Sequence, residues 1–188
     1  MTGPEAMIRS CDGVYTPRED SYLLSDAVMR IAKAGSKVLD LGTGTGIQGI
    51  TAALLGCSVT FSDIEEKAVE CAKRNAELNG VSGRFVTGDM FDSIVERFDM
   101  IIFNPPYVPS DALNGGVNGE DRALLGGVKG REAMDRFIAE YKEHLLQEGC
   151  ALIIETGPNG YDKDMKDGAE ILAKAHYFFE DIVVLKLQ

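Results

Sequence analysis

The chain has 188 residues, 45% of them hydrophobic, and it carries a formal net charge of −11 from 30 acidic and 19 basic side chains. This size and apolar content suit one domain with a sizeable core, so we expect residues 1–188 to form a single domain. The acidic balance disfavours a protein that grips nucleic acid by its phosphates, and it favours a protein or small-molecule partner.

The sequence gives no sign of a membrane segment, of secretion or of a metal centre. No apolar run approaches the roughly eighteen residues that span a bilayer, and we expect no signal peptide at the N-terminus. His144 and His176 are the only histidines, so the clustered ligands of a zinc site are missing. The scattered cysteines, none in a Cys-x-x-Cys pair, are expected to be small buried hydrophobic side chains in a reducing, cytoplasmic setting: Cys11, Cys57, Cys71 and Cys150.

Short apolar runs alternate with amphipathic segments, which predicts an α/β domain with a mostly parallel sheet. Thr16 is the expected N-cap of a first helix, Pro17 its first residue, and Ala34 its approximate end. The next expected elements are strand 37–41, helix 47–55, strand 58–62, helix 65–79, strand 84–87, strand 100–103, helix 131–146, strand 150–155 and strand 182–187. Residues 170–177 fit either the end of a helix or a strand that pairs with 182–187, and periodicity leaves this open.

Residues 108–130 are rich in glycine and turn formers, with no expected helix or strand. A loop of this length in a compact domain is usually a lid, a binding loop or disordered. We expect it to be mobile when no substrate is bound.

The segment Asp40-Leu41-Gly42-Thr43-Gly44-Thr45-Gly46 links an expected strand to an expected helix. Glycines let the backbone turn sharply and approach a ligand closely, and open α/β sheets bind ligands at this end of their strands. By itself the pattern fits NAD, FAD, S-adenosylmethionine (SAM) or a turn that binds nothing.

Three aspartates narrow the choice of ligand. Asp63 ends the second expected strand, where a carboxylate can accept both ribose hydroxyls, and Asp89 ends the third, where it can accept from an adenine amino group. The simpler interpretation is that both aspartates cap turns. Asp40 is placed to face the ammonium end of an amino acid, which a nicotinamide cofactor lacks, so it favours SAM.

The tetrapeptide Asn104-Pro105-Pro106-Tyr107 follows the expected strand 100–103 directly. The prolines remove two backbone donors and hold Asn104 extended. The Asn104 side-chain oxygen and the Pro105 carbonyl can each accept one hydrogen of a substrate –NH2 group, while Tyr107 stacks on its flat face. The alternative is a proline-stiffened turn that only closes a strand. Together with the glycine turn, the tetrapeptide indicates methyl transfer from SAM to an amide or amino nitrogen.

These two motifs resemble those of the class I SAM-dependent N-methyltransferases of the HemK-type glutamine methyltransferase group. Residues 14–24 and 126–137 are similar to its short archaeal and eukaryotic branch, and the likeness covers nearly the whole chain. Ser21 stands where Thr is usual and Asp40 where Glu is frequent, and both keep the functional group. The segment after residue 158 is short for the last helix and strands of the family.

The resemblance implies a Rossmann-like fold with a seven-stranded or slightly reduced sheet, helices on both faces, and residues 1–35 packed on the cofactor site. It implies methylation of the glutamine in the Gly-Gly-Gln loop of a class 1 translation termination factor, with S-adenosylhomocysteine as the other product. Some members also work with a small zinc-binding activator subunit that pairs with a sheet edge. The implied acceptor contacts run from Asn104 through Val108. The implied SAM contacts are Ser21, Asp40, Gly42, Thr43, Gly44, Gly46, Asp63, Ile64, Asp89, Met90 and Asn104.

Other functions remain open from the residues alone. A nucleic-acid N-methyltransferase could hold an adenine or guanine amino group with the same tetrapeptide, after drawing the base out of its stack. A protein that binds SAM without turnover is disfavoured by the intact Asn104 and Tyr107. An NAD-dependent oxidoreductase is the least favoured, because nothing supplies a hydride-transfer site.

Overall fold

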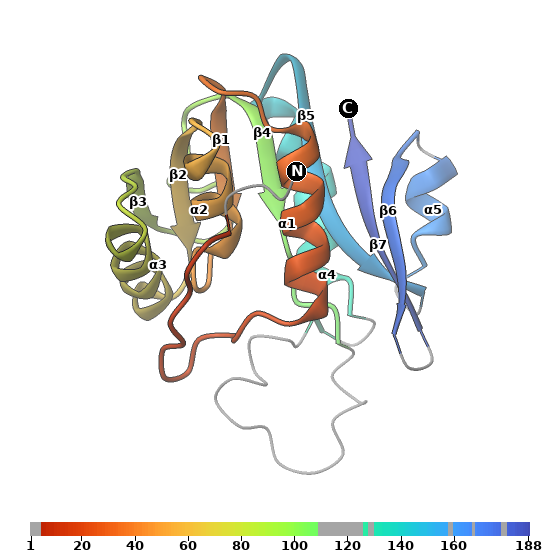
Figure 1. Cartoon of the computed structure of the whole chain (residues 1–188). Coiled ribbons are helices and arrows are strands. Elements are labelled where there is room, and N and C mark those ends of the chain that lie inside the picture. The colour runs from red at the N-terminus through yellow and green to blue at the C-terminus, as the bar shows by residue number, and fades with distance from the viewer. Residues whose placement is uncertain (1–4, 109–125, 128–129, 158–159, 167, 178–179) are drawn as a thin grey trace.

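A seven-stranded sheet forms the centre of the protein, with the strand order β3-β2-β1-β4-β5-β7-β6 (Figure 1). The computed structural model describes residues 5–108, 126–127, 130–157, 160–166, 168–177 and 180–188. The first five strands run parallel, whereas β7 lies antiparallel between β5 and β6. The strands are β1 (Lys37–Leu41), β2 (Ser58–Asp63), β3 (Arg84–Thr87), β4 (Phe98–Phe103), β5 (Leu145–Thr156), β6 (Glu170–Tyr177) and β7 (Glu180–Leu187).

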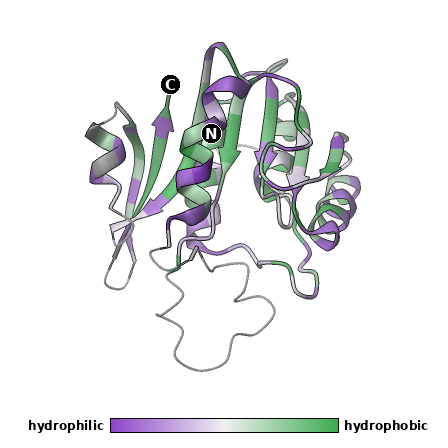
Figure 2. Ribbon diagram, turned by 180° about the vertical axis from the view of Figure 1, so that it is seen from behind, coloured by the Kyte–Doolittle hydropathy of each residue, from purple (hydrophilic) through white to green (hydrophobic). Residues whose placement is uncertain are grey.

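Helices cover both faces of this sheet. They are α1 (Glu19–Ile31), α2 (Ile47–Leu54), α3 (Glu66–Leu78), α4 (Glu132–Glu140), the 3-10 helix η2 (Tyr141–His144) and the short α5 (Asp162–Lys166). Successive side chains of a strand point to opposite faces. Accordingly, Val38 packs in one cluster with apolar residues of α1, α2 and α3, while Leu39 packs in another with residues of α4. Figure 2 shows hydrophobic residues, in green, along the central strands and hydrophilic residues, in purple, on the outer helices.

The parallel register brings three chain segments to one level. Leu41 at the end of β1 pairs with Ser62 of β2 and with Phe103 of β4. The residues that follow these three are Gly42, Asp63 and Asn104, so the glycine turn, the carboxylate and the amide leave the sheet side by side.

The expected start of the first helix is wrong by two residues. The N-cap of α1 is Arg18, whose backbone is extended, and the first helical residue is Glu19 instead of Pro17. Tyr15 lies ahead of the helix and contacts its first turn, since Tyr15 Oη donates to Asp20 Oδ1 at 3.0 Å.

The expected helix 131–146 is also too long. Helix α4 ends at Glu140, one turn of η2 follows, and β5 begins at Leu145, which pairs with Phe98 of β4. Backbone pairing with β4 therefore overrides an apolar spacing that continues the helical pattern. The choice left open for residues 170–177 is decided in favour of a strand, because β6 pairs antiparallel with β7 and completes the far edge of the sheet.

A buried ion cluster joins the start of α4 to the end of β5. Arg131 Nη1 lies 2.9 Å from Glu155 Oε1, and its Nη2 lies 3.0 Å from Asp164 Oδ2. Burial raises the pKa of Glu155 to about 8, an effect that the neighbouring Asp164 strengthens and Arg131 opposes. Two buried carboxyl groups thus share one guanidinium, whose Nε also lies 3.2 Å from Oδ1 of the more exposed Asp135.

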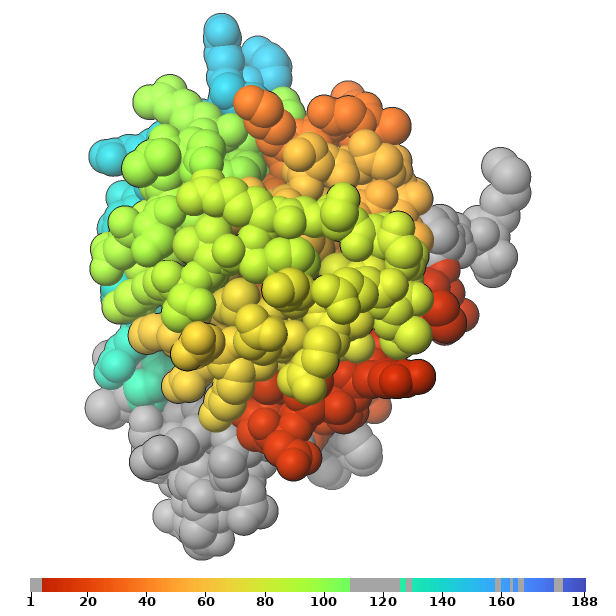
Figure 3. Space-filling model, turned by 90° about the vertical axis from the view of Figure 1, so that its left-hand side faces the viewer, coloured from red at the N-terminus to blue at the C-terminus, as the bar shows by residue number. Residues whose placement is uncertain are grey.

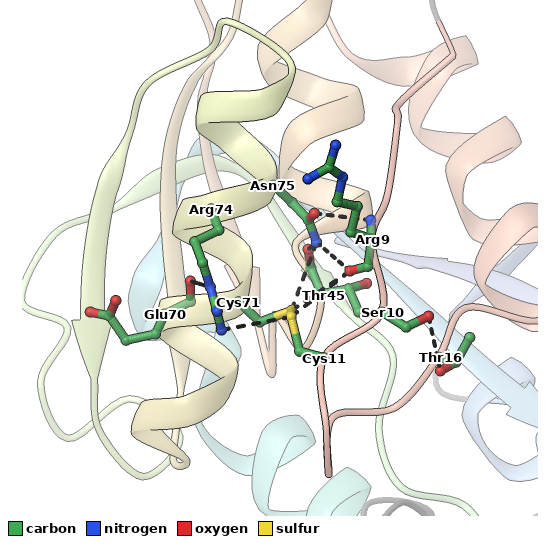
Figure 4. The surroundings of a disulfide bond; sticks show 9 residues. All are labelled: Arg9, Ser10, Cys11, Thr16, Thr45, Glu70, Cys71, Arg74 and Asn75. Carbon is green, nitrogen blue, oxygen red and sulfur yellow. Dashed lines mark hydrogen bonds between the residues drawn. A yellow bond between two sulfur atoms is a disulfide. The ribbon is translucent and has the colours of Figure 1, made fainter.

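The expectation that all four cysteines are unpaired is wrong for two of them. Cys11 and Cys71 form a disulfide across 60 residues of sequence, with their Cα atoms 6.2 Å apart (Figure 4). Cys57 and Cys150 are free and buried, as expected. Sequence spacing could not reveal the pair, because it exists only where the N-terminal segment crosses α3. The expected reducing, cytoplasmic setting stays a prediction, and it no longer rests on unpaired cysteines.

Two asparagines of α3 and its C-cap hold the same N-terminal segment. Asn75 Oδ1 accepts from the N–H of Arg9 at 3.0 Å, and its Nδ2 donates to the carbonyls of Arg9 and Thr45 at 3.1 and 2.9 Å. Asn79 accepts from the N–H of Met7 and donates to its carbonyl, at 2.8 and 2.7 Å. In the space-filling view the described N-terminal residues lie beside α3 (Figure 3).

None of the described helices has both the length and the apolar character to cross a bilayer.

The disulfide should stabilise this arrangement measurably. Because it closes a loop of about 60 residues, its loss is expected to lower the free energy of unfolding by about 2–4 kcal/mol. Thermal unfolding of the wild-type protein with and without reductant measures this. The Cys11→Ser/Cys71→Ser variant should unfold at the reduced wild-type temperature and should not respond to reductant; a shift with reductant in that variant would contradict the assignment.

Candidate cofactor and acceptor site

A cleft of about 470 Å³ opens at the carboxyl ends of β1, β2 and β4. Its walls come from the N-terminal segment, the glycine turn, the ends of β2, β3 and β4, and α4. Many of the residues singled out from the sequence line it: Ser21, Asp40, Gly42, Thr43, Gly44, Asp63, Ile64, Asp89, Met90, Asn104 and Pro106. The others, Gly46, Pro105, Tyr107 and Val108, lie next to these but do not line the cleft.

The glycine turn needs its glycines for backbone conformation. Gly42, Gly44 and Gly46 have φ angles of 63°, 54° and 86°, a region that side chains with a Cβ atom rarely adopt. Gly46 is the N-cap of α2, and a Cβ atom there would lie 3.0 Å from Ala72. Its position therefore serves the packing of α2 on α3, while the first two glycines face the cleft.

Asp63 is bonded to the glycine turn. Its Oδ2 accepts from the N–H of Gly44 at 3.0 Å, and its Oδ1 accepts from the N–H of Glu65 at 3.0 Å. Burial raises the pKa of Asp63, and these two backbone bonds oppose the rise. A carboxylate can accept about four hydrogen bonds, so two further hydroxyl donors, such as those of a ribose, can still bind here.

Asp40 is the most buried acid that lines the cleft, with 2% of its surface exposed. Its Oδ2 accepts from Thr43 Oγ1 at 2.6 Å and from the N–H of Gly49 at 2.9 Å. Burial raises its pKa to about 7 despite these bonds. A carboxyl group that titrates near neutral pH in a cleft responds strongly to a bound cation.

Asp89 and Met90 also line the cleft. Asp89 is half-exposed, and its two oxygens accept from Nη1 and Nη2 of Arg136 at 3.0 and 3.1 Å. Arg136 also lines the cleft, and sequence reasoning did not single it out. Met90 has a φ of 46°, the one positive φ among the described non-glycine residues. Such backbone conformations often mark binding sites.

Asn104 presents an oxygen that has no partner. Its Nδ2 donates to Asp20 Oδ2 at 3.0 Å, and the Tyr107 hydroxyl donates to the same oxygen at 3.2 Å. Asn104 Oδ1 is buried without a hydrogen bond. An unsatisfied buried acceptor is costly, and a ligand N–H would satisfy it. Asp20 is a residue that sequence reasoning missed as part of the site, since no periodicity relates residues 20 and 104.

The rest of the acceptor segment is held from the side of α4. The carbonyl of Val108 accepts from the N–H of Gly126 at 2.9 Å, and a Cβ atom on Gly126 would lie 2.3 Å from the Pro106 carbonyl oxygen. Glycine at 126 thus permits this close approach. The expectation of a mobile loop over 108–130 concerns mainly residues 109–125 and 128–129, which lie outside the described residues.

The N-terminal segment forms one side of the cleft. Gly13, Val14, Tyr15 and Pro17 line it together with the first turn of α1. In Figure 1 this segment, drawn in red, runs along the end of the molecule toward which β1 and β4 point. The disulfide and Asn75 therefore fix residues that lie directly at the cleft.

These observations fit a nucleoside cofactor with a cationic end. The glycine turn leaves room for a ligand to approach the backbone closely, and Asp63 can accept further hydrogen bonds. Asp40 is a buried acid, and Asn104 Oδ1 has no hydrogen-bond donor.

Comparisons with known proteins show the family to which the chain belongs. The family model "Methyltransferase small domain" matches residues 10–118. The putative protein N5-glutamine methyltransferase of Methanocaldococcus jannaschii is 35% identical over 92% of this chain and 90% of its own length. Methyltransferase HEMK2 of Homo sapiens is 31% identical over 81% of this chain and 76% of its own.

The chain belongs to the methyltransferase small-domain family, in its HemK-type glutamine methyltransferase group. A solved structure of the E. cuniculi Mtq2–Trm112 complex, responsible for methylation of the eRF1 translation termination factor, is 28% identical with a TM-score of 0.71 over 93% of this chain and 97% of that one. The sheet with its helices is the Rossmann-like class I methyltransferase fold. This HemK-type protein is therefore a SAM-dependent methyltransferase.

Binding of SAM to this HemK-type protein should depend on pH through Asp40. Its raised pKa, about 7, means that the neutral acid dominates below that pH. A cationic ligand favours the carboxylate, so binding should tighten as pH rises; from pH 6 to pH 8 we expect the Kd to fall about tenfold. Calorimetry across this range measures it, and Asp40→Asn should flatten the profile. An unchanged profile in that variant would assign the titration to another group, such as Asp63.

Proposed function

We propose that this protein transfers the methyl group of SAM to the side-chain amide nitrogen of a protein glutamine, in the Gly-Gly-Gln loop of a class 1 translation termination factor. The observation that carries the proposal is the buried, unpartnered Asn104 Oδ1 beside the cofactor cleft. The names of the relatives, which are glutamine methyltransferases, support the choice of acceptor.

An amide nitrogen is a poor nucleophile, because its lone pair is delocalised. In this proposal Asn104 Oδ1 and the Pro105 carbonyl each accept one N–H of the glutamine amide, and the ring of Tyr107 lies against its flat face. SAM supplies an electrophilic methyl group. The side chains then act by position and by polarising the N–H bonds as positive charge develops on nitrogen.

No strong base is needed in this scheme, because the proton leaves late, after cationic character has developed. The described residues that line the cleft include no histidine. The contacts proposed for SAM are Asp40 at its ammonium end, Asp63 at the ribose, and Asp89 with Met90 at the adenine, with Ser21, Thr43 and Ile64 completing the pocket.

For partners, the net charge of −11 suits a basic surface on the termination factor. We also propose a small zinc-binding activator subunit, by extension from the Mtq2–Trm112 complex. The two edge strands, β3 and β6, are the places where such a subunit could add a strand. Methylation rates measured with and without the candidate subunit test this.

The acceptor can be identified by competition. The protein is incubated with labelled SAM, the matched termination factor, tRNA and genomic DNA, and we expect label on the factor alone. A factor with Gln→Ala in its Gly-Gly-Gln loop is the control and should stay unlabelled. Label on either nucleic acid would replace the proposed acceptor with a base amino group.

Asn104→Ala should separate transfer from cofactor binding. Removing the Oδ1 acceptor is expected to lower kcat by about 100-fold to 1000-fold, the usual loss for one positioned polar group in a catalytic site. Affinity for SAM should stay within a few-fold of wild type, whereas Asp63→Ala should weaken SAM binding itself. Full turnover by Asn104→Ala would remove the proposed role of the tetrapeptide.

A further inference from the structure

Asp20 is a buried carboxylate that is surrounded by donors instead of by a counter-charge. It lies in the first turn of α1 and is 2% exposed. Oδ1 accepts from the N–H and the Oγ of Ser21 at 2.6 and 3.1 Å and from Tyr15 Oη at 3.0 Å. Oδ2 accepts from Asn104 and Tyr107. No described lysine or arginine forms an ion pair with it.

The contact with Asp20 decides which way the Asn104 amide faces. A carboxylate accepts hydrogen bonds and donates none, so the group of Asn104 that meets Oδ2 must be its –NH2. The amide is planar, with its oxygen and nitrogen on opposite sides. Its Oδ1 is therefore turned away from Asp20, and this is the buried oxygen without a partner. The flipped amide would set two acceptors against each other.

The groups that contact Asp20 Oδ1 are also hydrogen-bond donors. Burial, followed by the charge of Asp20, raises the pKa of Tyr15, so its hydroxyl remains a donor at any physiological pH. The backbone N–H of Ser21 is a donor under all conditions. The carboxylate therefore has one arrangement in which every neighbour is satisfied.

We propose that Asp20 is the positioning residue of the acceptor site: it locks the Asn104 amide and the Tyr107 hydroxyl so that Asn104 Oδ1 faces the substrate –NH2. The role deepens the function proposed above and rests on it. Asp20 touches neither the methyl group nor the acceptor and acts through Asn104.

A purely structural role is the alternative, since an acid in the first turn also stabilises α1 through the helix dipole. That role predicts lower thermal stability, with loss of turnover only through unfolding. The positioning role predicts a lower kcat in folded protein at saturating SAM and acceptor. The kcat of the folded variant therefore distinguishes the structural role from the positioning role.

Asp20→Asn keeps the shape of the side chain but has one acceptor oxygen in place of two, so it cannot accept from the donors on both sides. We expect kcat to fall about 100-fold, as for other misplaced reacting groups, while the circular dichroism of the folded protein stays unchanged. Asp26→Asn is the matched control, because Asp26 is an exposed acid of the same helix, and it should turn over as wild type. Wild-type kcat in folded Asp20→Asn would overturn the proposal.

An exchange of the two side chains gives the sharper test. Asn104→Asp alone sets two carboxylates face to face and should reduce kcat to a small residual value. In Asp20→Asn/Asn104→Asp, the new amide at 20 can donate to one oxygen of the new carboxylate at 104. The second oxygen of that carboxylate then faces the acceptor. We expect the double variant to exceed Asn104→Asp in kcat at least about tenfold, a coupling that independent sites would not give. A double variant no faster than Asn104→Asp would count against positioning.

A spectroscopic readout tests the contact without any acceptor. The side-chain –NH2 signals of Asn104, identified by their absence in Asn104→Ala, should exchange slowly with solvent in wild type and rapidly in Asp20→Asn. Equal exchange in the two proteins would overturn the proposal. If wild type labels no glutamine but these signals respond as expected, the proposed acceptor fails and the Asp20 contact stands.

Discussion

The parallel register of β1 with its two neighbours is the constraint on which the site depends. Because Leu41 pairs with both Ser62 and Phe103, the next residue of each strand emerges at the same level. A slip of one residue would turn every side chain of a strand to the other face. The core clusters on the two faces of β1 forbid such a slip, so ordinary hydrophobic packing sets the spacing of the glycine turn, Asp63 and Asn104.

The N-terminal segment supplies the part of the site that the sheet does not. It contributes one wall of the cleft through residues 13–15 and Pro17, and α1 places Asp20 against the end of β4. This segment has little regular structure of its own, so its position depends on the disulfide to Cys71 and on the side chains of Asn75 and Asn79. The cofactor wall is therefore held by α3, an element that contributes little else to the cleft.

Asp20, Asp40 and Asp63 lie in or beside the cleft, and each of these acids is satisfied differently. Asp20 is bonded to donors on both oxygens, Asp63 to two backbone N–H groups, and Asp40 to a hydroxyl and one N–H. Burial raises the pKa of Asp40 to about 7, because its two hydrogen bonds do not offset the cost of desolvation. A cationic cofactor suits such a site, since it adds the positive charge that these acids lack in the free protein.

The sequence by itself determined the α/β class, most strand positions and many of the residues that line the cleft, because short-range signals carry them. Apolar runs define strands, and glycines and prolines define turns, whatever the rest of the chain does. Tertiary structure alone decided the end of α4, the strand at 170–177, the Cys11–Cys71 pair and the place of Asp20 and Arg136 in the site. The strand at 170–177 depends on pairing with the neighbouring β7, and the others depend on contacts between residues distant in the chain. Neither kind of contact leaves a periodic trace in the sequence.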